Sequence, residues 1–320
     1  MKKFAAFTAL LILLISCDDG EVTVDEIDFS TATTQRCANL IYKIAGNEAL
    51  ILELPNQNAF ADDPTPPGEP LEFEISATNR VVYRSYNGAV SSVNICGTLP
   101  PASPVVVEEW TASSGTVEIV TVAVTTPSTD FEGGEIITDY RHTIVLRNVI
   151  FEKPSGSQLF ETFNFGILET DATSLPFNFD GSLARCGADG HLFDYVGEEG
   201  ILLNLDPGLL ANEITPSGQP RTALVGSDTN QLVYRLYSQQ GGSLTNEHFC
   251  GQAPLQPEIV QVWTGIAGVA GTSGIIEVTT TTNGANFLHE VRLVNTYLAR
   301  GNSVFKIADN YLLGQIITTP

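Results

Sequence analysis

The strongest constraint on the fold is that the chain contains the same pattern twice. Residues 78–86 read TNRVVYRSY, and residues 229–237 read TNQLVYRLY. Further landmarks return in the same order: Arg36-Cys37 with Arg185-Cys186, residues 48–55 with 199–207, Cys96-Gly97 with Cys250-Gly251, Trp110-Thr111 with Trp263-Thr264, residues 117–119 with 276–278, and His142 and Asn148 with His289 and Asn295. Ordered self-similarity of this kind indicates tandem copies of one fold. We therefore predict a first domain over residues 31–170 and a second over residues 184–320.

The local patterns are those of β-strands. Six segments are rich in Val, Ile and Thr and are separated by Gly, Pro, Asn and Ser: residues 105–111, 116–126, 136–150, 202–205, 259–264 and 275–282. In residues 140–148 alternation places Tyr140, His142, Ile144 and Leu146 on one apolar face. No window shows a convincing helical period. The fold class is therefore all-β, with two tandem β-sandwich-like domains as the prediction and two β-barrels as the alternative.

The first seventeen residues resemble the signal of a bacterial lipoprotein. Lys2 and Lys3 precede an apolar run that ends in LISC at Cys17. The run is too short for a membrane-spanning helix. The ending is similar to a lipobox, which implies that residues 1–16 are a removed signal peptide and that Cys17 is lipidated. Residues 17–30 would then form a tether between the lipid and the first domain.

The acidic stretch DDGE at residues 18–21 is similar to the export signal of surface-exposed lipoproteins of Bacteroidota. A solvated acidic tether is the alternative interpretation. The resemblance implies an outer-membrane protein, anchored by lipid and facing the cell exterior, with the periplasmic face as the alternative.

Charge excludes one class of partner. The chain has 37 acidic against 15 basic residues. Nucleic-acid binding takes much of its affinity from Lys and Arg contacts to phosphate, so no nucleic-acid ligand is expected. The partners that remain, beyond the lipid anchor in the membrane, are a glycan or an envelope protein.

Four cysteines remain once Cys17 is set aside, two in each copy. An exported protein meets an oxidising compartment in which disulfides persist. Because each copy must have folded alone, we predict the pairs Cys37–Cys96 and Cys186–Cys250, with pairing between the domains as the alternative. Closely spaced cysteines are missing from the sequence, so we expect no zinc site and no other metal site.

Six residues are candidates for binding. Trp110 and Trp263 are interpreted as core residues packed opposite a disulfide, and the alternative is an exposed platform for a sugar ring. The repeated motif containing Arg84 and Tyr86, and again Arg235 and Tyr237, places each Arg and its second Tyr on one strand face. Either simple surface packing or a binding face would explain this motif.

The sequence lacks the short motifs of common catalytic sites, and we predict no catalytic residues and no cofactor. His142 and His289 are interpreted as buried histidines bonded to a carbonyl. Asp189, His191 and Asp194 are read as a solvated turn, with metal ligation as the alternative. The function predicted is a non-catalytic binding or adhesion module. The alternatives are an accessory subunit of an outer-membrane transport or secretion complex and, third, a glycoside hydrolase whose two carboxylates meet in space.

Overall fold

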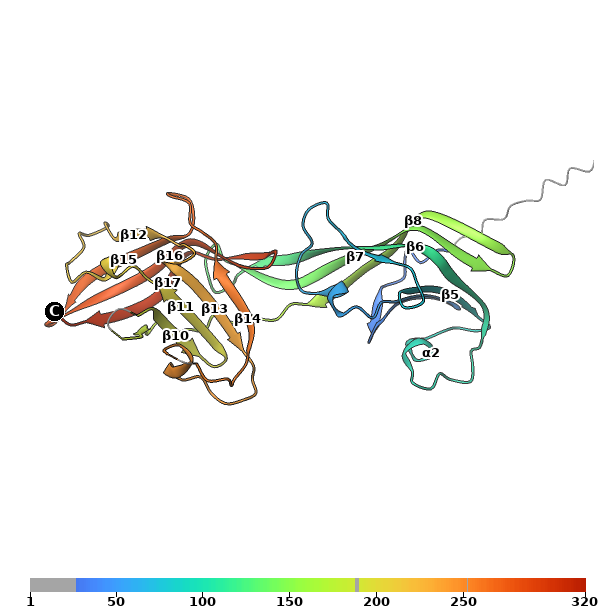
Figure 1. Cartoon of the computed structure of the whole chain (residues 1–320), viewed down its shortest axis with the longest axis horizontal. Helices are drawn as coiled ribbons and strands as arrows, with labels where there is room; N and C mark the ends of the chain where they lie inside the picture. The colour runs from blue at the N-terminus through green and yellow to red at the C-terminus, as the bar shows by residue number, and fades with distance from the viewer. Residues whose placement is uncertain (1–26, 188–189, 252) are drawn as a thin grey trace, which may run out of the picture.

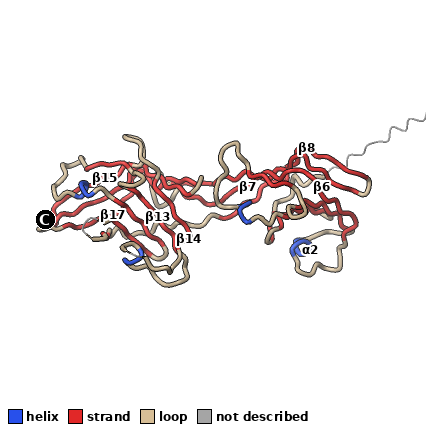
Figure 2. The backbone as a smooth tube through the Cα atoms, in the orientation of Figure 1, coloured by secondary structure: helices blue, strands red, loops and turns tan. Residues whose placement is uncertain are grey.

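The computed structural model describes residues 27–187, 190–251 and 253–320. The predicted signal peptide, Cys17 and most of the tether therefore lie outside the described residues. Two β domains lie end to end along the long axis of the molecule (Figure 1). Strands are the main regular structure of both domains and helices are few and short (Figure 2), which confirms the all-β, two-domain prediction.

The elements of the first domain are β1 (Gln35–Cys37), β2 (Leu40–Ala45), β3 (Glu48–Glu53), η1 (Gln57–Phe60), β4 (Leu71–Glu74), β5 (Arg80–Tyr86), α2 (Ser92–Cys96), β6 (Val106–Pro127), β7 (Glu135–Lys153) and β8 (Gly156–Asp171). Those of the second domain are β9 (Ala184–Arg185), β10 (Leu192–Val196), β11 (Glu199–Asn204), η2 (Pro207–Leu210), β12 (Arg221–Leu224), β13 (Gln231–Tyr237), η3 (Asn246–His248), β14 (Ile259–Gly265), β15 (Ile275–Asn283), β16 (Asn286–Arg300) and β17 (Ser303–Thr318).

Each domain is one continuous antiparallel sheet that curls over its own core. In the first domain the order is β1-β2-β3-β5-β6-β7-β8, and β4 also pairs with β6. The long strand β6 pairs with β5 at its start and with β4 farther along, so it links two halves of the sheet that face each other. Ile41 and Leu50 from one half and Ile119 and Leu146 from the other belong to the same buried cluster. The packing is sandwich-like, although the sheet is not divided in two.

Gly115 lies where β6 passes from one half-sheet to the other. Its φ is +126°, and a Cβ there would lie 2.8 Å from the Cα atom of Val149. Only glycine fits such a backbone. The sequence predicted separate strands on the two sides of this position, but the structure has one strand with an irregular register. In the second domain residues 266–274 do interrupt the equivalent strand and separate β14 from β15.

Direct contacts join the domains in addition to the linker. The hydroxyls of Tyr140 on β7 and Ser303 lie 3.0 Å apart. Arg300 donates from Nη2 to the carbonyl of Asp62 at 2.8 Å, and the N–H of Asn302 donates to Oδ1 of Asp63 at 2.7 Å. The β16–β17 turn of the second domain is thus bound to the η1–β4 loop of the first. We call the contacts of Asp62 and Asp63 with Arg300 and Asn302 the clasp.

Candidate functional site

The structure forms the two predicted disulfides, and each pins a long loop across the outer face of its sheet. Cys37–Cys96 and Cys186–Cys250 have Cα–Cα distances of 6.0 and 5.3 Å. The loops are residues 87–105, the first lobe, and residues 238–258, the second lobe. Both lobes project from the same side of the molecule (Figures 1 and 2).

A small second core lies beneath each lobe, on the face of the sheet that points away from the main core. Under the first lobe it consists of Tyr42, Ala49, Ile51, Tyr86 and Val90, with Cys37 packed against it. Under the second lobe the equivalent cluster consists of Phe193, Leu202, Tyr237, Leu244 and Phe249, with Cys186 and Cys250 packed against it. The sheet therefore separates each disulfide from the main core.

Both tryptophans belong to the main core. Trp110 is 4% exposed and lies 4.5 Å from the ring of Tyr83, and Trp263 is 2% exposed. Each indole N–H donates to a residue two positions earlier, Glu108 at 2.8 Å and Gln261 at 2.9 Å. The core interpretation is confirmed, but the expected packing of Trp against the disulfide is wrong, because the disulfides lie on the other face. Neither ring presents the open face that a sugar platform needs.

The predicted faces of the Tyr-Arg-x-Tyr motif are confirmed. Tyr83 and Tyr234 point into the main cores, whereas Tyr86 and Tyr237 lie in the outer clusters. The hydroxyls of Tyr86 and Tyr237 are buried and have no hydrogen-bond partner among the described residues.

The two arginines of this motif differ in their partners. Nε of Arg84 donates to Glu109 on the neighbouring strand at 2.7 Å. Arg235 faces Val262 at the same register position. Among the arginines that the structure describes, Arg235 alone has a side chain without a hydrogen bond, ion pair or ring contact.

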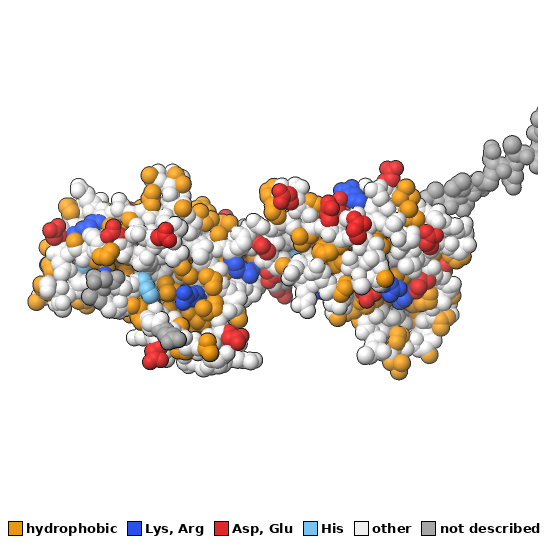
Figure 3. Space-filling view, in the orientation of Figure 1, with side chains coloured by type: hydrophobic (Ala, Val, Ile, Leu, Met, Phe, Trp, Pro, Cys, Tyr) orange, Lys and Arg blue, Asp and Glu red, His pale blue; other side chains and the backbone are white. Residues whose placement is uncertain are grey.

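Arg235 lines an open hollow of about 480 Å³ between β13 and the second lobe. Its walls consist of Arg235, Tyr237, His248, Ala253, Pro254, Leu255, Pro257, Glu258 and Ile259. On the visible face of the second domain, basic and histidine side chains lie among hydrophobic ones (Figure 3). A hollow of this size has room for an amino-acid side chain together with its terminal group.

His142 and His289 are completely buried, as predicted, but their partners are hydroxyl groups. Nδ1 of His142 lies 2.8 Å from Oγ1 of Thr121, and Nε2 lies 3.1 Å from Oγ1 of Thr170. His289 repeats the arrangement with Thr280 and Thr318, both at 2.8 Å. Burial, followed by Arg36, lowers the pKa of His142 to about 4. The recurrence of this triad in both domains identifies it as part of the scaffold.

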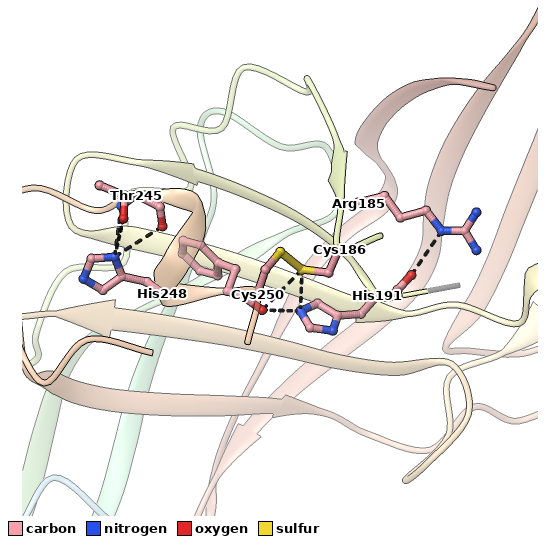
Figure 4. The surroundings of a disulfide bond; sticks show 8 residues. Arg185, Cys186, His191, Thr245, His248 and Cys250 are labelled. Atoms are coloured by element: carbon pink, nitrogen blue, oxygen red, sulfur yellow. Dashed lines mark hydrogen bonds between the residues drawn. A yellow bond between two sulfur atoms is a disulfide. The ribbon is translucent and has the colours of Figure 1, made fainter. Parts of the chain in front are cut away.

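The remaining histidines hold the second lobe in place (Figure 4). Nε2 of His191 lies 2.7 Å from the carbonyl of Phe249, beside the disulfide. Nε2 of His248 lies 2.9 Å from the carbonyl of Gln256. Asp194 accepts the backbone N–H groups of Gly181 and Tyr195, and burial raises its pKa. Within the described ranges no group of three or more His, Cys, Asp or Glu is arranged to hold a metal ion.

The junction between the domains contains a narrow crevice. Aromatic side chains of both domains line it, among them Phe131, Phe177, Trp263 and Phe305. It leaves about 40 Å³ for solvent, enough for about three water molecules. Nε of Arg300 is buried here without a partner among the described residues. The crevice is too small for a ligand in this arrangement of the domains.

Exposed apolar side chains recur at the two lobes. Leu99 is 89% exposed and Leu255 is 90% exposed. More of them lie where each lobe joins the next strand: Val105, Val106 and Val107 in the first domain and Ile259, Val260 and Val262 in the second. We call each lobe with these residues a lobe surface.

No described helix has the length and apolar character needed to cross a membrane. Comparisons with protein-family models, with curated proteins and with solved structures give no match to this chain.

Proposed function

We propose that this chain is a lipid-anchored protein of the bacterial cell surface that binds a protein partner without catalysis, through its two lobe surfaces. The observation that supports this most directly is the recurrence of the same exposed apolar lobe in both domains. Single exposed apolar residues are normal, but grouped ones indicate interaction sites. Here the grouping occurs twice, in the equivalent loop of each domain and on one side of the molecule.

The lobes have the properties of a contact surface. A disulfide and a buried cluster hold each one, so little conformational entropy is lost when a partner binds. Two linked contacts also increase affinity, because the second binding event becomes intramolecular. Burial of Leu99 or Leu255 would contribute about 2 kcal/mol each.

A protein partner fits these surfaces better than a glycan. Sugar recognition commonly uses an exposed aromatic ring, and the two tryptophans are buried. The lobe surfaces offer aliphatic side chains instead, which suit the apolar centre of a protein interface. The placement on the cell exterior rests on the lipobox-like sequence and the acidic tether.

The test is binding of the full chain to immobilised envelope and extracellular proteins of the producing bacterium. We expect the double variant Leu99→Asp, Leu255→Asp to lose at least tenfold in affinity. The control is Leu159→Asp, Ile317→Asp, which alters side chains of 55% and 53% exposure on β8 and β17, away from the lobes. Equal loss in both variants would contradict the proposal.

Two treatments of the immobilised envelope and extracellular material identify the class of partner. Proteolysis of that material should abolish binding, and periodate oxidation of its sugars should leave binding intact. The reverse result would establish a glycan ligand and overturn the protein-partner proposal. Protease shaving of intact cells tests the location, because cleavage in residues 62–69 or 265–274 requires exposure to the exterior.

A further inference from the structure

We propose that the hollow at the second lobe binds the C-terminal carboxylate of a polypeptide that ends in an aliphatic residue, with Arg235 pairing with the carboxylate. This inference rests on the proposed function, since it specifies what part of a protein partner the second lobe surface takes. The first lobe surface has no equivalent role, because its arginine is already occupied.

The two copies of the fold differ at one cross-strand pair on their outer faces. Arg84 and Arg235 occupy the same position in the two copies, and each is half-buried on the outer face of its sheet. In the first domain Glu109 neutralises Arg84 at 2.7 Å. In the second domain the residue opposite Arg235 is Val262, which is 43% exposed and cannot accept a hydrogen bond. The second copy thus retains the arginine but has no acidic residue at the position that corresponds to Glu109.

The guanidinium of Arg235 is available to an anionic ligand. The chain carries 37 acids, yet Arg235 has no ion pair among the described residues. A free guanidinium has five N–H donors and binds a carboxylate with two parallel hydrogen bonds. Glu258 also lines the hollow, where Oε1 accepts a hydrogen bond from Gln256 at 3.2 Å. The negative charge of Glu258 disfavours a ligand that carries several negative charges.

The hollow combines an apolar wall with an available cation. Pro254, Leu255, Pro257 and Ile259 form apolar walls beside Arg235. The other basic side chain in the wall, His248, already uses both ring nitrogens, with Thr245 and with the Gln256 carbonyl. Among the described residues that line the hollow, Arg235 is therefore the one cationic group without a partner, and it lies next to an aliphatic surface. A C-terminal residue carries a carboxylate and an aliphatic side chain on one carbon atom, which matches this arrangement.

An unpartnered polar atom also lies in the wall of the hollow, although the equivalent hydroxyl of Tyr86 at the first lobe is unpartnered too. Tyr237 is 4% exposed, contributes to the wall of the hollow, and its buried hydroxyl has no partner among the described residues. Buried polar groups without a partner are uncommon in folded proteins. A bound ligand, or a water molecule that it orders, would supply the missing hydrogen bond.

The experiment measures binding of fluorescent hexapeptides ending in leucine to the full chain by anisotropy. One peptide has a free C-terminal carboxylate and the other has a C-terminal amide. We expect saturable binding of the free acid and at least tenfold weaker binding of the amide. Arg235→Ala and Val262→Glu should each lose at least tenfold in affinity, since the second variant recreates the ion pair of the first domain. Arg84→Ala is the matched control and should bind as the unaltered chain does.

Three results would overturn the inference. The first is equal binding of the free-acid and amide peptides, and the second is full binding of the free-acid peptide by Val262→Glu. The third is competition by hexanoate as strong as that by the peptide, which would show that the site accepts any aliphatic carboxylate. These outcomes are separable from the proposed function. If the peptides fail while Leu99→Asp, Leu255→Asp still abolishes surface binding, the carboxylate site is wrong and the protein-binding function stands. If the peptides bind while the Leu99→Asp, Leu255→Asp variant binds the immobilised proteins normally, the lobe-surface proposal fails instead.

Discussion

The hydroxyl of Tyr234 donates a 2.5 Å hydrogen bond to the carboxylate of Glu199. That carboxylate also accepts the backbone N–H groups of Phe177 at 2.7 Å and Asn178 at 3.2 Å. Burial, and then the bond to Glu199, raises the pKa of Tyr234 far above its usual value, so the phenol stays protonated. One buried acid thus holds the linker between the domains against the core of the second domain.

Replacement of Glu199 by Gln should therefore destabilise the second domain by about 1–3 kcal/mol, because buried donors would be left poorly satisfied. The matched variant is Glu48→Gln, which alters the 2.5 Å bond between Tyr83 and Glu48. Glu48 is half-buried and holds no linker backbone, so we expect a smaller loss. Urea denaturation of both variants measures the difference. Equal losses would show that the linker contacts contribute nothing.

The clasp should control the angle between the domains more than the stability of either one. Asp63→Ala with Asn302→Ala removes two polar contacts of the η1–β4 loop with the β16–β17 turn and leaves the bond from Arg300 to the Asp62 carbonyl. We expect unchanged thermal unfolding and a wider distribution of shapes in small-angle X-ray scattering. Glu161→Ala, at an exposed position on β8, serves as the control. An unaltered scattering curve would show that the remaining contacts between the domains, such as those of Tyr140 and Arg300, are sufficient to fix the junction.

The disulfides should stabilise the lobes in particular. Cys37→Ser with Cys96→Ser opens a loop whose ends are 59 residues apart, and chain entropy gives about 4 kcal/mol for such a loop. Because the main core lies on the other face of the sheet, amide exchange should rise first in residues 87–105. The pair Cys186→Ser, Cys250→Ser should act likewise on residues 238–258. Uniform exchange across a whole domain would contradict this local effect.

The duplication, the strand content and the cysteine pairing could be predicted from the sequence because they depend on patterns that the two copies share. The continuity of β6 could not, because Gly115 looks like a turn residue when its neighbours in space are unknown. The lack of an acidic partner for Arg235 could not be predicted either. The loss of the acid at position 262 is visible in the sequence, but its meaning depends on the cross-strand register that places Arg84 opposite Glu109. Likewise, the place of the disulfides outside the main core depends on which face the lobes cover.

The buried histidines should make the chain sensitive to mild acid. The folded pKa of His142 is about 4, against an ordinary value of 6.5, because burial and then Arg36 disfavour its charged form. Between these values the unfolded chain binds a proton that the folded chain does not. The contribution of His142 to the free energy of unfolding is thus complete above pH 6.5 and is lost as the pH falls toward 4.

Replacement of His142 by Gln removes this titration while retaining a polar side chain between Thr121 and Thr170. We expect the unaltered chain to lose more stability than the variant between pH 6.5 and 4, by at most about 1.4 kcal/mol per pH unit, the limit for one proton. Urea denaturation at several pH values gives both slopes, and the carboxylates common to the two proteins cancel in the difference. His289→Gln should behave in the same direction, because burial also lowers the pKa of His289. Parallel pH profiles for the variant and the unaltered chain would show that the pKa of His142 is the same in the folded and unfolded states, and the Thr-His-Thr arrangement would then accommodate a charged ring.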